Sequence, residues 1–212
     1  MKIQLALDRL SISEAIQVTS LVESSVDWIE VGTSLIKEFG MDSIKQLKQA
    51  FPQKAILADT KTMDNAKYEL EISFAAGADI VTVMGTAPMI TIETCIEIAK
   101  KYQKMVMIDL LNTSQEQQKK LFSLQDVILC KHIGKDEQEL SKNSWNSSGF
   151  LKEEATSNIL IAAAGGITLE TFPQLIKDQV DIAIIGSAIT KAANPTEVAK
   201  KFNELAKGGI LQ

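Results

Sequence analysis

Several residue types that commonly reveal a binding partner are scarce in this chain of 212 residues. Arg9 is its only arginine and His132 its only histidine, and no run of lysines and arginines interrupts a sequence whose net charge is −5. A nucleic-acid-binding surface needs clustered positive charge, so it is not expected here. Any anion that the protein binds must be held mainly by backbone N–H groups, lysines or a metal ion.

Cysteines and long apolar runs are also few. Cys95 and Cys130 lie within apolar patterns, where a free cysteine usually behaves as a small hydrophobic residue, so we expect both in the core and neither in a disulfide or metal site. The apolar residues 159–164 are far too few to span a membrane, and the first eight residues lack the length and cleavage site of a signal peptide. These features predict a cytoplasmic protein without a membrane partner.

Eight short apolar runs recur along the chain, beginning near residues 3, 27, 55, 80, 105, 127, 158 and 182, at intervals of roughly 22 to 31 residues. That interval accommodates a strand, a loop and a crossover helix. No linker of unusual composition divides the chain, so we expect one domain over residues 1–212. A doubly wound open sheet gives the same local pattern, but eight repeats favour a closed (β/α)8 TIM barrel.

Helical patterns separate the apolar runs. Ser11 and Glu14 have the spacing of a capping box before an amphipathic segment, and Pro195 is a favoured first-turn residue for the last helix. The segment from 139 to 157 differs because its centre is rich in serine and asparagine. It predicts a surface loop followed by a short helix, either a lid over the site or a tolerated insertion.

The third apolar run ends in the motif D-x-K-x-x-D, formed by Asp59, Lys61 and Asp64. Alternation along a strand places Asp59 and Lys61 on one face and Thr60 on the other. The same residues could instead form a purely structural salt bridge that closes the barrel rim. If Asp59 and Asp64 flank Lys61, both favour its charged form, which suits stabilisation of an oxyanion better than Schiff-base formation.

Active sites of these barrels lie at the carboxyl ends of the strands, and five of the eight predicted ends carry an ionisable group. Glu30 and Asp59 come from adjacent strands, so their carboxylates can converge and hold Mg²⁺. Alternatively, Glu30 could simply pair with Lys61. His132 can move protons at neutral pH. The predicted ends are occupied by Asp8, Glu30, Asp59 with Lys61, Thr82, Asp109, His132, Gly165 with Gly166, and Gly186 with Ser187.

Glycines follow the seventh and eighth strands, at Gly165, Gly166 and Gly186, the last being followed by Ser187. Exposed N–H groups at glycines and at helix N-termini bind anions, and these two loops are the usual phosphate site of the fold. The sequence therefore predicts a phosphorylated sugar whose reacting end lies over the acids and Lys61. The predicted chemistry is stabilisation of an enediolate, formed by deprotonation beside a carbonyl or by loss of CO₂.

The chain resembles the orotidine-phosphate-decarboxylase suprafamily, and within it the branch that holds 3-hexulose-6-phosphate synthases and 3-keto-L-gulonate-6-phosphate decarboxylases. The resemblance runs nearly from end to end, and the D-x-K-x-x-D set is its most specific part. It is carried by Gln4-Leu5-Ala6-Leu7-Asp8, Glu30-Val31-Gly32-Thr33, Ala58-Asp59-Thr60-Lys61-Thr62-Met63-Asp64, Gly77-Ala78-Asp79, Gly165-Gly166 and Ala192-Ala193-Asn194-Pro195.

The resemblance implies roles for these residues. Glu30 and Asp59 would hold Mg²⁺ (or Mn²⁺), and Lys61 would stabilise the enediolate. Asp64 would reach into the neighbouring subunit's site, which makes the protein a homodimer with sites at the interface. In the same way, Asp8 and Asp109 would contact substrate hydroxyls, and His132 would transfer a proton.

Three positions choose between the sister activities. Asp109 and Ser187 resemble the synthases, in which the enediolate of D-ribulose 5-phosphate adds to formaldehyde. Lys135 stands where the decarboxylases carry a basic residue that contacts substrate, so 3-keto-L-gulonate-6-phosphate decarboxylase stays open as the alternative. A barrel that binds a sugar phosphate without turnover is the alternative from another class.

Overall fold

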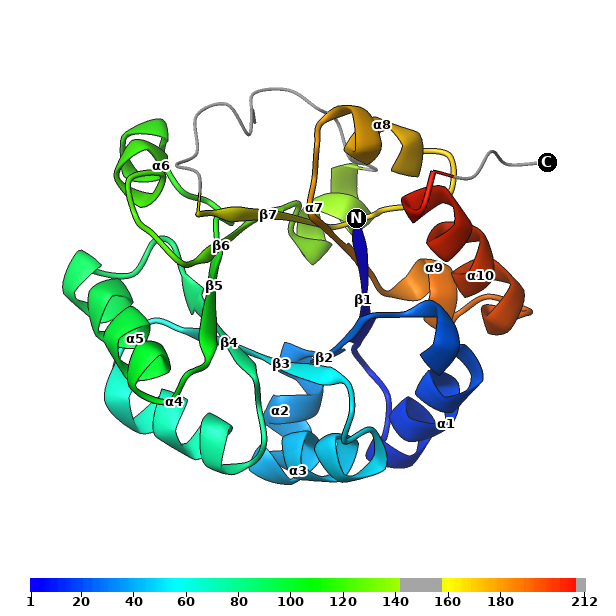
Figure 1. Cartoon of the computed structure of the whole chain (residues 1–212), viewed down its shortest axis with the longest axis horizontal. Coiled ribbons are helices and arrows are strands. Elements are labelled where there is room, and N and C mark those ends of the chain that lie inside the picture. The colour runs from blue at the N-terminus through cyan, green and yellow to red at the C-terminus, as the bar shows by residue number, and fades with distance from the viewer. Residues whose placement is uncertain (142–157, 209–212) are drawn as a thin grey trace.

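The computed structural model describes residues 1–141 and 158–208, and within them eight parallel strands close into a barrel in chain order. The strands form a ring with the helices outside it (Figure 1). The predicted (β/α)8 barrel is thus confirmed, and the open sheet is excluded because β1 pairs with β8. The strands are β1 (Lys2–Leu7), β2 (Trp28–Val31), β3 (Ala55–Thr62), β4 (Ile80–Met84), β5 (Met105–Asp109), β6 (Ile128–His132), β7 (Leu160–Ala164) and β8 (Ile182–Ile185).

The two helix starts that the sequence predicts are confirmed. Ser11 and Glu14 form the expected capping box, and Pro195 occupies the first turn of the last helix. No helix within the described residues is long and apolar enough to cross a membrane. The helices are α1 (Ile12–Val22), the 3-10 helix η1 (Glu23–Ser25), α2 (Thr33–Phe39), α3 (Met41–Ala50), α4 (Ala66–Ala75), α5 (Met89–Lys101), α6 (Gln115–Leu121), α7 (Lys135–Ser141), α8 (Phe172–Lys177), α9 (Ser187–Thr190) and α10 (Pro195–Ala206).

Two helical segments differ from the prediction. The second unit holds two helices, α2 and α3, in place of the single crossover helix expected in each unit, and Gly40 separates them with φ of 60°, a conformation that glycine adopts without strain. The predicted loop at 139–157 begins too early, because residues 139–141 still belong to α7. Asp136 and Glu137 in the first turn of α7 favour that helix. The rest of the predicted loop and helix, residues 142–157, lies outside the described residues.

Apolar side chains pack in two clusters that follow from the alternation of each strand. One cluster includes Trp28, Leu57 and Met107, and lies within the barrel. The other packs the opposite strand faces against the helices and includes Ile29, Ile56 and the buried helical residues. Both cysteines are free and buried, Cys130 in the inner cluster and Cys95 in the outer one, so their predicted place in the core is confirmed.

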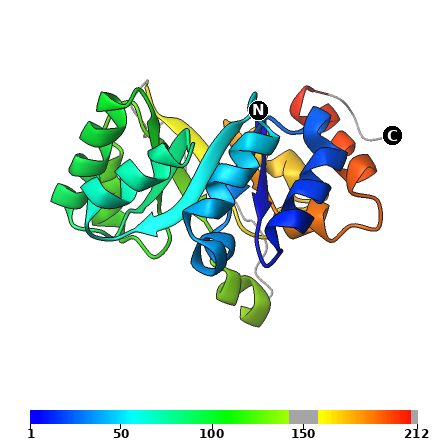
Figure 2. The same ribbon diagram turned by 90° about the horizontal axis from the view of Figure 1, so that it is seen from below.

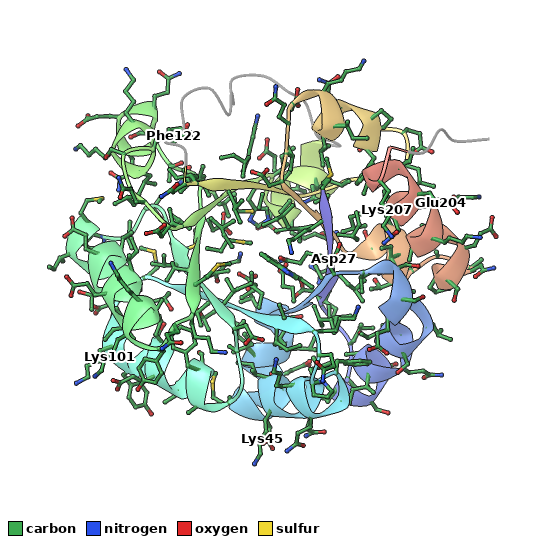
Figure 3. The ribbon with its side chains drawn as sticks, in the orientation of Figure 1. Asp27, Lys45, Lys101, Phe122, Glu204 and Lys207 are labelled. Atoms are coloured by element: carbon green, nitrogen blue, oxygen red, sulfur yellow. The ribbon has the colours of Figure 1, made fainter. Side chains whose placement is uncertain are left out.

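At the amino ends of the strands, aspartates join neighbouring strands in a repeated way. Asp27, Asp79 and Asp181 each stand directly before an even-numbered strand. Their carboxylates accept the backbone N–H of Ile3, Ile56 and Ile161 of the preceding strand, at 2.8, 3.0 and 2.8 Å. Figure 3 labels Asp27 beside the barrel wall, whereas Lys45 and Lys101 project from the outer helices. These carboxylates are structural.

The two ends of the barrel are distinct. In Figure 2 the N-terminus lies at the upper end of the barrel, and α7 projects beyond the lower end. Because β1 runs away from the N-terminus and all strands are parallel, the lower end in this view holds the carboxyl ends of the strands. The predicted site residues therefore lie at the end from which α7 projects.

Candidate active site

The carboxyl ends of the strands surround a cavity of about 860 Å³. Its volume is within the range of pockets that bind small molecules. Every residue predicted for the site lines this cavity except Asp64. The predicted lining residues are Asp8, Glu30, Asp59, Lys61, Asp109, His132, Lys135, Gly165, Gly166, Gly186 and Ser187.

The motif on β3 brings an acid and a lysine into the cavity together. Lys61 Nζ lies 3.2 Å from Asp59 Oδ1 and 3.1 Å from Asp59 Oδ2, so the predicted common face is confirmed. The backbone is less regular than the prediction assumed, because the ladder to β4 shifts between Ala58 and Thr62. Lys61 adopts a φ of 50°, which is uncommon for a residue other than glycine.

The second acid beside Lys61 is Asp109 from β5. Lys61 Nζ donates to Asp109 Oδ2 at 2.8 Å. Burial by itself would lower the pKa of Lys61, but Asp59 and Asp109 outweigh that cost and raise the pKa above its ordinary value. Lys61 is therefore a cation at neutral pH, as predicted, although the acid that flanks it with Asp59 is not Asp64.

Asp109 joins Lys61 to the only histidine. The same Oδ2 that accepts from Lys61 lies 2.8 Å from Nδ1 of His132. Within residues 1–141 and 158–208, the other ring nitrogen, Nε2, makes no such contact. Burial would raise the pKa of Asp109, but hydrogen bonding and charge from His132 and Lys61 lower it to about 2. A carboxylate beside Nδ1 fixes the ring orientation, which leaves Nε2 as the atom that can accept or give a proton.

Glu30 has a different environment from the two aspartates. It is buried, and Gln4 Nε2 donates to its Oε2 at 2.5 Å. Burial and the charge of Asp59 raise the pKa of Glu30 to about 8. The ammonium of Lys61 pairs with Asp59 and Asp109, so the simple Glu30–Lys61 salt bridge considered from the sequence is not formed.

The chemistry of Glu30 and Asp59 fits a divalent cation. The negative charges of these two buried carboxylates repel each other, so a cation placed between them would stabilise both. Mg²⁺ commonly uses one or two carboxylates together with water and substrate oxygens. Among the described residues, no group of three or more His, Cys, Asp or Glu side chains forms a complete protein cage for a metal. A cation here would therefore share its ligands between the protein and a substrate.

The opposite part of the cavity wall is built from backbone. Gly165 and Gly166 follow β7 with φ of 102° and 65°, and Gly186 and Ser187 begin α9 after β8. A Cβ at Gly165 would collide with the carbonyl oxygen of Ile133, so only glycine fits there. The first N–H groups of a helix lack partners within it, and small residues leave them open to an anion.

Several residues of the cavity wall were missed by sequence reasoning. Thr33 in the wall donates its hydroxyl to Asp59 Oδ2 at 2.6 Å, and Gln4, which is fully buried and does not line the cavity, donates to Glu30. A glutamine within the apolar first strand was the available signal, since a buried polar side chain needs a polar partner. Arg9, Lys37 and Lys191 also line the cavity, so positive charge does surround it.

Two predicted residues have additional or different contacts. Asp8 lines the cavity, and its Oδ1 also accepts from the backbone N–H and hydroxyl of Ser34, at 3.2 and 2.7 Å. Lys135 lines the cavity beside Glu139, with 3.5 Å between their charged groups. Asp64 is exposed and accepts from the N–H of Asn65 at 2.7 Å, and in the described part of the chain it does not line the cavity.

Comparison with known proteins gives consistent matches. Residues 1–202 match the family described as Orotidine 5′-phosphate decarboxylase / HUMPS. The chain is 38% identical over 211 residues to a 3-hexulose-6-phosphate synthase of Bacillus subtilis (strain 168), a match that covers 99% of this chain and 100% of the relative.

Solved structures extend these matches to the fold. A crystal structure of 3-hexulose-6-phosphate synthase from Salmonella typhimurium superposes with a TM-score of 0.91 at 34% identity, covering 99% of this chain and 100% of the other. A 3-keto-L-gulonate-6-phosphate decarboxylase from Vibrio cholerae O1 superposes with a TM-score of 0.84 at 26% identity, covering 99% of each chain.

Proposed function

The chain belongs to the orotidine 5′-phosphate decarboxylase / HUMPS family, and we propose that it acts as a 3-hexulose-6-phosphate synthase, a lyase that joins formaldehyde to D-ribulose 5-phosphate. The observation that carries this proposal is the Lys61 cation between Asp59 and Asp109, which lies in the same cavity as a glycine-built wall. A cation fixed in this way can stabilise an enediolate. The product would be arabino-3-hexulose 6-phosphate, and the reaction is reversible.

The phosphate group of the substrate would bind at Gly165, Gly166, Gly186 and Ser187. Backbone N–H groups there supply donors without charge, and Lys191, which lines the same cavity just after α9, supplies a positive charge nearby. Binding at this wall places the carbonyl end of the sugar over Lys61 and the acids. Asp8, Asp109 and Lys135 would contact the substrate in between.

Bond making would involve two proton movements. The proton at C1 of D-ribulose 5-phosphate leaves to a base, the resulting enediolate carbon forms a bond to the carbon of formaldehyde, and the formaldehyde oxygen takes up a proton. Nε2 of His132 is the atom that supports proton transfer, because Nδ1 faces Asp109. Lys61 stays protonated throughout and stabilises the negative charge on the enediolate oxygens.

Glu30 and Asp59 would hold Mg²⁺ (or Mn²⁺). When bound, the ion supplies Lewis-acid stabilisation of negative charge on substrate oxygens. Gln4 and Thr33 support this role, since they hydrogen-bond the two carboxylates and so restrict their orientation.

The protein would be a homodimer in which Asp64 completes the partner's site. Asp64 is exposed, and the apolar side chains of Met63, Tyr68 and Ile90 are exposed by 46, 60 and 69%. Exposed apolar side chains of this size suit an interface. If the sites are shared, mixing inactive Lys61→Ala and Asp64→Asn chains restores activity, because a hybrid dimer contains one intact site. Mixtures that stay inactive although hybrid dimers form would contradict the shared site.

The direct test of the proposed activity is consumption of D-ribulose 5-phosphate. We expect consumption only with formaldehyde present, loss of activity with EDTA, and recovery with Mg²⁺. Release of CO₂ from 3-keto-L-gulonate 6-phosphate without any response to formaldehyde would replace the proposal with the decarboxylase. Substrate binding without either reaction would indicate a non-catalytic barrel.

A further inference from the structure

The hydroxyl of Thr82 on β4 connects two groups of the site at once. Thr82 is 3% exposed, and its Oγ1 accepts the backbone N–H of Lys61 at 2.9 Å. The same hydroxyl donates its proton to Asp59 Oδ1, also at 2.9 Å. One buried side chain thus contacts both the backbone of the cation and the carboxylate that pairs with it.

The contact lies where the β-ladder is interrupted. Ala58 pairs with Val81 and Thr62 with Val83, so three residues of β3 oppose the single residue Thr82 of β4. Such a bulge leaves N–H groups without their usual partners in the ladder. The side chain of Thr82 replaces the missing partner for the N–H of Lys61.

Lys61 needs this support because its backbone is left-handed, with a φ of 50°. This conformation is costly for a residue with a Cβ and persists only where surrounding contacts hold it. Here it directs the ammonium of Lys61 between Asp59 and Asp109. A different conformation at this residue would displace the charge from the position where the enediolate forms.

We infer that Thr82 is a positioning residue, whose hydroxyl holds Lys61 in its left-handed conformation and orients the Asp59 carboxylate. This inference rests on the proposed function. Thr82 lines the cavity, but the role assigned to it acts through Lys61 and Asp59 and not through the substrate. Loss of the hydroxyl should therefore slow the reaction without weakening binding at the glycine wall.

Thr60 offers a matched control on the neighbouring strand. Its hydroxyl donates to the backbone carbonyl of Thr82 at 2.9 Å and lies 3.0 Å from that of Thr62, so it belongs to the same bulge. Thr60 does not line the cavity, and within the described part of the chain its hydroxyl bonds neither Asp59 nor Lys61. Thr60→Val therefore removes a hydroxyl from the bulge but leaves the cation and its acid partner in contact with Thr82.

The test measures kcat, KM for D-ribulose 5-phosphate and Tm for Thr82→Val, Thr82→Ser and Thr60→Val. In Thr82→Val we expect kcat to fall on the order of 100-fold, the effect of a misplaced catalytic group, with KM changed by less than about threefold. Thr82→Ser, which keeps the hydroxyl, and Thr60→Val should retain kcat within about threefold. Both valine variants should lose roughly 2–8 °C in Tm, since each loses a hydrogen bond.

An unchanged kcat in Thr82→Val, or an equal loss in Thr60→Val, would overturn the inference. If Thr82→Val does not fold, Thr82→Cys takes its place, because a thiol is only a weak donor and acceptor. Wild-type protein that shows no formaldehyde-dependent turnover would refute the proposed function, whereas an active wild type with an equally active Thr82→Val would refute only the role of Thr82.

Discussion

Carboxylates occupy both ends of the barrel, but their surroundings differ. At the amino ends of the strands, Asp79 accepts the N–H of Ile56 and pairs with Lys48 and Lys104, at 2.8 and 2.5 Å. Burial alone would raise the pKa of Asp79, but these partners together lower it. Asp79 is thus paired within the protein by a backbone N–H and two lysines, a role in stability.

At the carboxyl ends, the acids face a cavity. Burial and a neighbouring acid raise the pKa of Glu30 to about 8, and the ammonium of Lys61 is held between two carboxylates. Strongly shifted pKa values beside a cavity are typical of functional sites. The comparison teaches that residue type alone does not separate a structural acid from a functional one; the number of partners and access to a cavity do.

The largest difference in kcat between variants at the two ends of the barrel is expected when a lysine is removed from each end. Lys61→Ala should lower kcat by about 10³-fold, because it removes the cation that stabilises the enediolate. Lys48→Ala, which removes a lysine that pairs with Asp79 at the other end, is the control and should leave kcat near the wild-type value. Steady-state kinetics with formaldehyde and D-ribulose 5-phosphate measures both, and similar losses in the two variants would contradict the distinction.

Metal binding gives an effect of intermediate size, with a defined pH dependence. Without metal, the raised pKa of Glu30 means that the folded protein binds this proton more tightly than the unfolded chain, so its contribution to stability is full below about pH 4.5 and is lost as pH rises through about 8. A cation needs the ionised carboxylate, so the rise in Tm caused by Mg²⁺ should increase from pH 6 to pH 9.

Thermal unfolding of two variants tests this assignment. Glu30→Gln should remove the Mg²⁺-dependent rise in Tm and its pH dependence. Glu38→Gln on the exposed part of α2 should retain both. A rise in Tm that persists unchanged in Glu30→Gln would place the metal elsewhere.

The smallest effect on catalysis is expected at the amino ends. Asp79→Asn should lower the free energy of unfolding by about 1–3 kcal/mol, because Lys48, Lys104 and the N–H of Ile56 lose a charged partner. Its kcat should remain close to that of the wild type. Denaturant unfolding and steady-state kinetics on the same sample check the two parts, and lost activity in a folded variant would show that this end affects the chemistry.

Much of the cavity could be predicted because the apolar runs locate the strand ends. Parallel strands in a closed barrel bring those ends together, so residues as distant in sequence as Asp8 and Gly186 face one cavity. Prediction needed only the eightfold repeat and the rule that such barrels have their site at one end. The roles of the residues in catalysis stay predictions until they are tested.

The contacts within the site could not be predicted in the same way. Lysine has no preference for a left-handed backbone, so the conformation of Lys61 follows from the bulge against β4, not from local sequence. Asp109 is 48 positions from Lys61, and spacing could not show that it would take the place expected for Asp64. Packing between strands determines both features.

The central claim is that the carboxyl-end cavity forms an enediolate from D-ribulose 5-phosphate, and proton exchange at C1 tests it most directly. The sugar phosphate is incubated in D₂O with the Mg²⁺-loaded protein and no formaldehyde, and its C1 protons are followed by NMR. We predict that wild-type protein exchanges a C1 proton for deuterium and that Lys61→Ala does not. No exchange by wild-type protein, or equal exchange by Lys61→Ala, would contradict the account.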